Sequence, residues 1–151
     1  MSDLSNSSKI LAVCISEKKG LQKKPVDNVI LKQHHGIVGD AHAGDWHRQV
    51  SLLSIDSVKK VQENIDFKLN PGDFAENILI DKGICLYELP IGTKLKIGSA
   101  ITRVTQIGKE CHSDCAIRQK AGDCVMPREG IFVEVIEDGE AKMGDLVVVI
   151  E

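Results

Sequence analysis

The sequence predicts a mostly β, single-domain fold of the β-barrel or sandwich type, with one or two short helices. Two observations favour it. Runs rich in β-forming residues recur about every ten residues, and glycine, proline or aspartate turns separate them. Only one stretch spaces its apolar residues as a helix does. A third observation concerns size: 151 residues suit one domain, and no linker or internal repeat divides the sequence.

The first half of the chain begins with a polar stretch. Residues 1–8 are predicted to form a disordered tail, so the domain would extend over residues 9–151. The lysine-rich residues 17–25 are predicted to be a solvent-exposed loop. Alternating or apolar runs predict strands over residues 9–16, 29–31, 48–54 and 76–80.

One short helix is predicted between these strands, because Ser54 or Asp56 can cap a segment that continues to about Asn64. Residues 137–140 contain Asp-Gly, a pair typical of hairpin turns, and are predicted to form a tight reversal. The second half has further strand patterns over residues 93–97, 100–107, 130–136 and 146–150.

Composition argues against several function classes. The net charge of −3 gives no general reason to expect nucleic-acid binding, and aromatic residues make up only 3% of the chain. No apolar run approaches bilayer length, so no membrane association is expected. The sequence has no export signal, and its five cysteines are an odd number; both features predict a reducing, cytoplasmic location. Cys14 and Cys85 lie in strand-like runs and are predicted to be inert.

Three of the five cysteines, Cys111, Cys115 and Cys124, lie within residues 108–124. Two kinds of chemistry suit this cluster. With a histidine, the three thiols can complete a tetrahedral zinc site in a non-enzymatic structural module. Alternatively Cys111 is a reactive thiol, and Cys115 or Cys124 resolves a persulfide or sulfenate on it through a transient disulfide.

A reactive Cys111 would depend on its neighbours. Sulfur transfer needs a thiolate, which is the nucleophile that accepts sulfane sulfur. Lys109 and His112 flank Cys111 and are expected to lower the pKa of its thiol by favouring the charged form. These three residues are the predicted catalytic group.

A series of short stretches occurs in an order that resembles a known family. They are GIVGDAH (residues 36–42), RQVSLL (48–53), PGDFAEN (71–77), LPIG (89–92), EGIFVEV (129–135) and GDLV (144–147). Together with a cysteine after a long strand, they resemble the MOSC domain. This module occurs at the C-terminus of molybdenum cofactor sulfurases and in small stand-alone bacterial proteins. The resemblance extends from about Lys9 to Ile150.

The resemblance implies a β-barrel-like fold that binds molybdenum cofactor (molybdopterin) or transfers sulfur, with Cys111 as sulfur carrier or metal ligand. The sequence lacks the pyridoxal phosphate-dependent domain that strips sulfur from cysteine. A cysteine desulfurase or other sulfur donor is therefore expected as a partner, with a molybdoenzyme as acceptor. Cys115 and Cys124 are not part of the general family pattern.

The same resemblance implies where a cofactor would bind. Its phosphate would suit an arginine assisted by N–H groups of the glycine-rich loop, and polar side chains would bond the pterin. The implied cofactor-binding residues are Gly39, Asp40, His42, Arg48, Asn77 and Arg118. Some family members act with molybdenum on hydroxylated nitrogen compounds, so a detoxifying activity is a further alternative. Exposed strand edges make a homodimer plausible.

Overall fold

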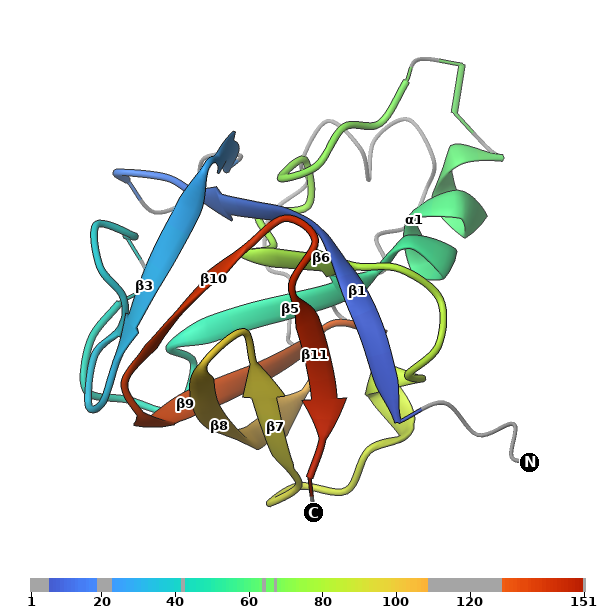
Figure 1. Cartoon of the computed structure of the whole chain (residues 1–151). Helices are drawn as coiled ribbons and strands as arrows, with labels where there is room; N and C mark the ends of the chain where they lie inside the picture. Colours follow the sequence, from blue (N-terminus) through green and yellow to red (C-terminus); the bar gives the residue numbers. More distant parts are fainter. Residues whose placement is uncertain are drawn as a thin grey trace.

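The computed structural model describes residues 6–18, 23–41, 43–63, 65–66, 68–108 and 129–150. Within them, seven strands form a closed barrel in the order β1-β11-β7-β8-β9-β5-β6, and a pairing of β11 with β1 closes it (Figure 1). The predicted mostly β, barrel-type fold is confirmed. The barrel strands are β1 (Ser7–Ile15), β5 (Val50–Ser54), β6 (Ile78–Ile80), β7 (Lys94–Ile97), β8 (Ala100–Ile107), β9 (Ile131–Glu137) and β11 (Leu146–Val149).

Shorter elements lie outside the barrel. β2 (Lys24–Val26) pairs with the end of β1, and β10 (Gly139–Lys142), β3 (Asn28–Lys32) and β4 (Gly36–Ile37) form a three-stranded sheet in that order. In Figure 1 this sheet lies on the left of the barrel and α1 (Ile55–Gln62) on the right. A 3-10 turn, η1, covers Leu86–Glu88. No helix in the described part of the chain is long and apolar enough to cross a membrane.

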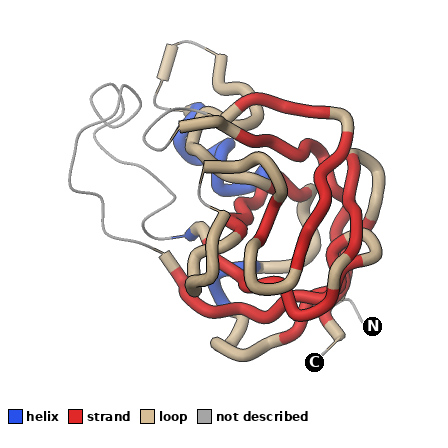
Figure 2. The backbone as a smooth tube through the Cα atoms, turned by 90° about the vertical axis from the view of Figure 1, so that its left-hand side faces the viewer, coloured by secondary structure: helices blue, strands red, loops and turns tan. Residues whose placement is uncertain are grey.

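Ser54 ends β5 and begins the helix. Its Oγ accepts a hydrogen bond from the N–H of Asp56 at 3.2 Å, which satisfies one of the free donors of the first turn and confirms the predicted cap. The buried face of α1 presents Val58 and Val61 to an apolar cluster that includes Phe132. Figure 2 shows the helix outside the strands on one side of the molecule. The connection through α1 allows β5 and β6 to pair in parallel.

The barrel interior is filled by inward-facing aliphatic side chains from every strand. Each fully buried Leu, Ile or Val contributes about 1.5–3 kcal/mol relative to exposure. The largest of them, all less than 2% exposed, include Ile10, Leu52, Ile78, Leu95, Ile97 and Ile131. Alternation along each strand places these residues inside and polar residues outside, as in β7, where buried Leu95 and Ile97 alternate with exposed Lys94 and Lys96.

Most predicted strands are confirmed within two residues at either end. β1 begins at Ser7 and not at Lys9, because Ser7 and Ser8 pair with β11. Residues 1–5 of the predicted tail lie outside the described residues. The sequence does not predict the short strands β2, β4 and β10, because their residues (KPV, GI and GEAK) contain no run of β-forming side chains, unlike the equally short β6, β7 and β11.

The tight reversal predicted over residues 137–140 does not make a hairpin, because β10 pairs with β3 and not with β9. Gly139 is needed for a different reason. The start of β10 crosses the β7–β8 turn so closely that a Cβ on Gly139 would lie 2.3 Å from the backbone nitrogen of Ala100. A Cβ on Gly98 would lie 2.2 Å from the carbonyl oxygen of Glu140.

Candidate functional site

The candidate site lies where β8 ends and where the loop over residues 38–49 enters β5. Arg48 occupies this point half-buried, and two neighbours fix its side chain. Its Nε donates to Oε1 of Gln106 at 3.0 Å, and its guanidinium carbon lies 5.5 Å from the ring centroid of Phe132. A cation over an aromatic face and an amide oxygen at Nε hold the guanidinium plane in one orientation.

Gln106 connects this arginine to its surroundings. Its Oε1 also lies 3.0 Å from Nε2 of His47, and its Nε2 donates to the carbonyl oxygen of Gly108 at 2.7 Å. The Oγ1 of Thr105 donates to the carbonyl oxygen of His47. Trp46, 37% exposed, meets the His47 ring edge-on with centroids 5.8 Å apart. One cation and two exposed rings therefore gather at this end of the barrel.

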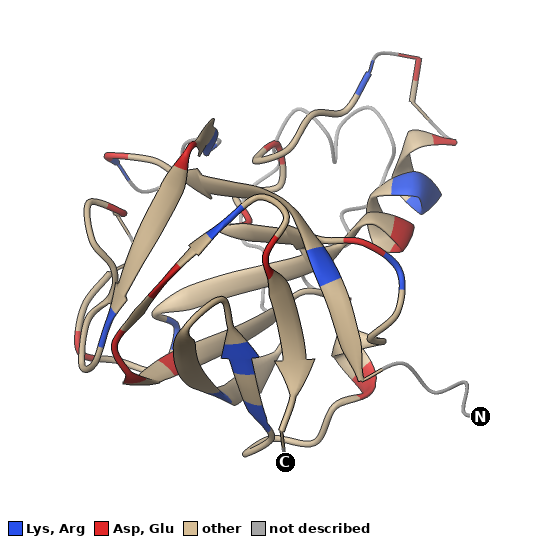
Figure 3. Cartoon of the chain, viewed as in Figure 1, with Lys and Arg blue, Asp and Glu red and all other residues tan. Residues whose placement is uncertain are grey.

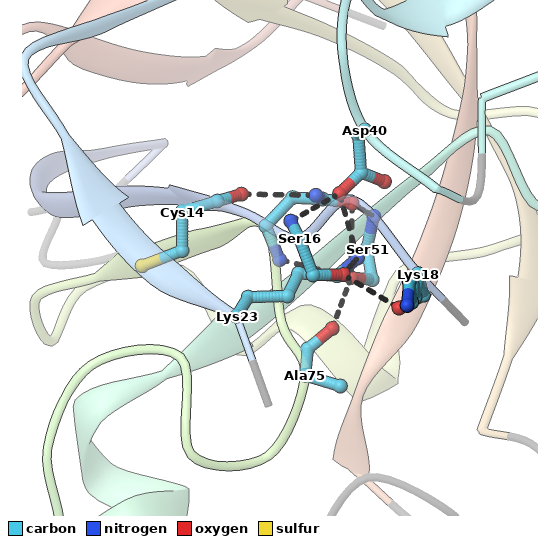
Figure 4. Close-up of polar contacts among 8 residues, drawn as sticks. Cys14, Ser16, Lys18, Lys23, Asp40, Ser51 and Ala75 are labelled. Carbon is cyan, nitrogen blue, oxygen red and sulfur yellow. Dashed lines mark hydrogen bonds and ion pairs between the residues drawn. The ribbon is translucent and has the colours of Figure 1, made fainter. Parts of the chain in front are cut away.

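A buried ion pair anchors the loop that carries these groups. Nζ of Lys23 lies 2.7 Å from Oδ1 of Asp40, and both side chains are 0% exposed (Figure 4). The same Oδ1 accepts from the N–H of Ser16 at 3.1 Å, and Lys23 donates to Oγ of Ser16 at 3.3 Å. The N–H of Ala41 donates to the carbonyl oxygen of Ser16 at 2.8 Å. The loop is thereby tied to the end of β1.

The prediction that residues 17–25 are a solvated loop is wrong at Lys23. Its ammonium is buried because Asp40 and Ser16 supply the acceptors that water would otherwise provide. Gly39, by contrast, is exposed, with φ +89, a backbone conformation that L side chains rarely adopt. Glycine at this position therefore serves the turn. The predicted cofactor contacts of Gly39 and Asp40 stay predictions.

Asn77 belongs to a separate buried network. Its Oδ1 accepts from the N–H of Ser51 at 3.0 Å, and its Nδ2 donates to the carbonyl oxygen of Cys14 at 3.0 Å. Oγ of Ser51 lies 3.3 Å from the carbonyl oxygen of Ala75 (Figure 4). Asn77 is 1% exposed, and these bonds join β1, β5 and the start of β6. Its predicted contact with a pterin stays a prediction.

Glu76 is the described carboxyl group whose pKa its surroundings change most. It is 0% exposed, and its carboxylate accepts from the N–H groups of Gly72 at 2.7 Å and Phe74 at 3.1 Å. Burial raises the pKa of Glu76 from 4.5 to about 7, although these hydrogen bonds oppose the shift. Burial, with the Glu76 charge, raises the pKa of the Cys14 thiol to about 12. The predicted inertness of Cys14 agrees with a fully buried thiol.

Comparison with known proteins identifies the family. A sequence model of the MOSC domain matches residues 39–148. The chain belongs to the MOSC domain family. No curated protein sequence matches the MOSC chain significantly.

Solved structures share the MOSC chain's fold. The YuaD protein from Bacillus subtilis superposes with a TM-score of 0.76 at 18% identity, covering 93% of this chain and 94% of that one. YiiM from Geobacillus stearothermophilus superposes with a TM-score of 0.70 at 16% identity, covering 95% and 75%. YiiM from Escherichia coli gives 0.66 at 16% identity, covering 96% and 70%. At these identities the similarity establishes the fold alone.

Many of the predicted site residues of this MOSC domain lie outside the residues that the structure describes. These are His42, Lys109, Cys111, His112, Cys115, Arg118 and Cys124. Of the predicted residues that are described, Gly39, Asp40 and Arg48 lie on one loop, and Asn77 lies in the separate network above. The described chain contains no group of three or more His, Cys, Asp or Glu side chains that could hold a metal.

Sequence reasoning missed Lys23 and Gln106, both of which act through other residues. No local pattern distinguishes Lys23 from its exposed neighbour Lys24, because burial depends on Asp40, which is 17 positions away in sequence. Gln106 lies near the end of β8, where a polar residue in a strand ordinarily indicates only an outward face. Its role is defined by Arg48, which is 58 positions away.

Cys85 differs from the prediction that it lies inert in a strand. It precedes η1 and is exposed, although partial burial raises the pKa of its thiol above the ordinary value. The thiol lines a hollow of about 260 Å³ beside α1, together with Lys60, Tyr87 and Glu129. Lys60 lies 2.9 Å from Glu129, so its charge is compensated.

Proposed function

We propose that this MOSC domain binds molybdenum cofactor and carries sulfur for its sulfuration or delivery through Cys111. The observation that carries the proposal is the match of the family model to residues 39–148, which include every candidate residue. Family membership associates the chain with molybdenum cofactor chemistry, and the clustered thiols of residues 108–124 supply a means of carrying sulfur.

The described end of the barrel fits a group with a phosphate and a flat ring. Gln106 accepts the hydrogen bond from Nε of Arg48. No described residue hydrogen-bonds the two terminal nitrogens of Arg48, and these are the donors that bind a phosphate in bidentate fashion. Trp46 and His47 offer exposed rings beside it. When bound, the cofactor would supply a molybdenum atom and its sulfur ligands; Arg48 would hold its anionic end.

Cys111 would perform the transfer itself. It follows Gly108 by three residues, so the chain can carry it at most about 11 Å from Gly108. Its thiolate would attack the outer sulfur of a donor persulfide. The donor's S–S bond breaks, its thiolate leaves, and Cys111 keeps the sulfane sulfur as a persulfide. Lys109 and His112 would favour the thiolate before attack. A cysteine desulfurase fits the donor role, and a molybdoenzyme the acceptor.

Intact-mass spectrometry tests the sulfur step. The wild-type protein, incubated with a cysteine desulfurase and cysteine, is expected to gain one sulfur atom, and Cys111→Ser is expected to gain none. Cys85→Ser is the matched control because Cys85 is the exposed thiol of the described chain, and it should gain sulfur like the wild type. Equal sulfur on Cys111→Ser and on wild type would remove Cys111 from the mechanism.

Cofactor retention tests the binding step. Arg48→Ala is expected to lower affinity for molybdopterin roughly 10- to 100-fold, the loss typical of one charge-assisted pair. Arg103→Ala is the control, since Arg103 lies on the outer surface in an ion pair with Glu134 at 2.5 Å. Metal analysis of the same preparations separates this proposal from the zinc alternative: stoichiometric zinc lost together with the fold on chelation would favour a structural module.

A further inference from the structure

A second hollow, of about 570 Å³, lies between the β7–β8 turn, β10 and β11. The hollow and the candidate site lie at opposite ends of β8. Ser99, just before the strand, lines the hollow, whereas Gln106, near the end of the strand, contacts Arg48. Seven strand residues separate these two positions by about 23 Å. Nothing in the proposed chemistry uses this hollow.

The outer face of β11 and the residue that follows the strand form an apolar row beside the hollow. Leu146 is 49% exposed, Ile150 is 43% exposed, and Val148 between them is half-buried. Residue alternation points these three side chains away from the barrel, while Val147 is fully buried inside. An exposed apolar row of this kind is typical of a contact surface.

Lysines flank the row on both sides. Lys9 on β1 pairs with Leu146, Lys96 on β7 pairs with Val148, and the carbonyl of Lys94 bonds the N–H of Ile150. Lys142 on β10 lines the hollow with Lys96. None of these four ammonium groups makes an ion pair within the described residues. Figure 3 shows the basic positions of β1, β7 and β10 around an uncharged β11.

The other polar groups of this face are already engaged. Asp145 accepts from the N–H of Lys142 at 3.1 Å, and Glu140 accepts from the side-chain amide of Asn28. The free edge of β10 is also used, since the N–H of Ser99 donates to the carbonyl oxygen of Glu140 at 3.0 Å. With the backbone satisfied, strand addition is disfavoured, and recognition must go through side chains.

We propose that this hollow docks an acidic amphipathic segment of a partner protein, with apolar side chains against β11 and carboxylates against the lysines. The hollow itself is lined by two lysines and two carboxylates, but with Lys9 and Lys94 beside the apolar row the face has four lysines to two carboxylates, and this excess of positive charge favours an acidic occupant. A second copy of this chain related by a two-fold axis would bring the lysines against each other, which disfavours self-association. An anionic bilayer is flat, whereas this face is hollow. The inference goes beyond the proposed function and does not depend on cofactor or on Cys111.

The test uses a fluorescein-labelled helical peptide of about 15 residues with leucines on one face and glutamates beside them. Fluorescence anisotropy is expected to show micromolar binding that weakens as salt rises. In Lys96→Glu/Lys142→Glu the affinity should fall at least about tenfold. The control Lys59→Glu/Lys68→Glu changes the net charge equally at exposed lysines elsewhere and should bind nearly as well as wild type.

Amide chemical-shift changes in the labelled protein should gather on β7, β10 and β11 and spare Arg48 and Gln106. A thermal melt of each variant checks that it is folded. The proposal is overturned if the wild type does not bind the peptide at low salt, or if both charge-reversed pairs bind alike. It is equally overturned if anionic vesicles bind and the peptide does not, or if the chain forms a dimer that Leu146→Ser disrupts.

Discussion

The Lys23–Asp40 pair is the clearest case of one residue positioning a site. Two fully buried charges at 2.7 Å are tolerated only because each has further partners, here around Ser16. Asp40 lies eight positions before Arg48 on the same loop. The pair therefore fixes the path by which the loop brings the arginine to the barrel end.

Lys23→Met should leave the Asp40 carboxylate buried without its cation. Breaking a buried pair in this way destabilises by about 3–5 kcal/mol, measured by urea denaturation. Lys24→Met, at the exposed neighbouring position, should stay within about 0.5 kcal/mol of wild type. Replacing both members, as Lys23→Met/Asp40→Leu, should recover part of the loss. If Lys23→Met and Lys24→Met unfold at the same urea concentration, the pair has no anchoring role.

Glu76 should make stability depend on pH. Its pKa is about 7 in the folded protein and 4.5 ordinarily, so the folded state binds the proton more tightly. The contribution of the protonated Glu76 to the free energy of unfolding is full below pH 4.5 and is lost as pH rises towards 7. It amounts to about 3 kcal/mol at most. Glu76→Gln should remove this loss of stability, whereas Glu63→Gln, at an exposed carboxylate, should retain it. Urea denaturation across this pH range measures the stability of both variants. Identical pH profiles for wild type and Glu76→Gln would show that Glu76 is not the source of the pH dependence.

At the scale of elements, the crossing of β10 over the β7–β8 turn joins the small sheet to the barrel. Gly98 and Gly139 allow the two backbones to approach within the space that a Cβ would occupy. The N–H of Ser99 and the carbonyl of Glu140 then bond at 3.0 Å. The crossing also forms one wall of the lysine-flanked hollow, so its geometry matters for docking.

Gly98→Ala tests this crossing against a matched glycine. Gly98 and Gly144 both have positive φ, at +59 and +95, so alanine is strained at either position. Only at Gly98 would the new Cβ also meet backbone, at 2.2 Å, whereas Gly144 has nothing within 4 Å. Gly98→Ala should lose about 1–3 kcal/mol more than Gly144→Ala in thermal or urea unfolding. Equal losses of stability in the two variants would show that the two backbones can move apart at the crossing to accommodate a Cβ.

Elements with an apolar or alternating run were predictable from sequence, including the short strands β6 and β7, whereas the short strands without such a run were not. β8 alternates over eight residues and was predicted with its observed bounds, and Ser54 caps α1 as expected from its hydroxyl. β10 was missed because its pairing with β3 is nonlocal, and the Asp138-Gly139 signal indicated a local hairpin instead. A turn signal states that the chain can reverse; it does not state which strand will be the partner.

At the level of the whole molecule, the site too depends on contacts between distant segments that no local sequence pattern predicts. Arg48 follows from the family resemblance and not from a local pattern, and its contact with a cofactor stays a prediction. Lys23, Gln106 and the burial of Glu76 depend on segments brought together only by closure of the barrel. The order of the family-like stretches was informative where single residues were not, because it reflects the complete fold.

Barrel closure depends on β11, which pairs with β7 on one side and β1 on the other. Adjacent valines of this strand test it. Val147 is 0% exposed inside the barrel, so Val147→Asp would bury an unpaired carboxylate and should cost more than about 4 kcal/mol, with loss of cooperative unfolding. Val148→Asp points outward beside Lys96 and should change stability by less than about 1 kcal/mol. Urea unfolding followed by circular dichroism distinguishes them, and similar losses for both would mean that β11 does not seal the barrel.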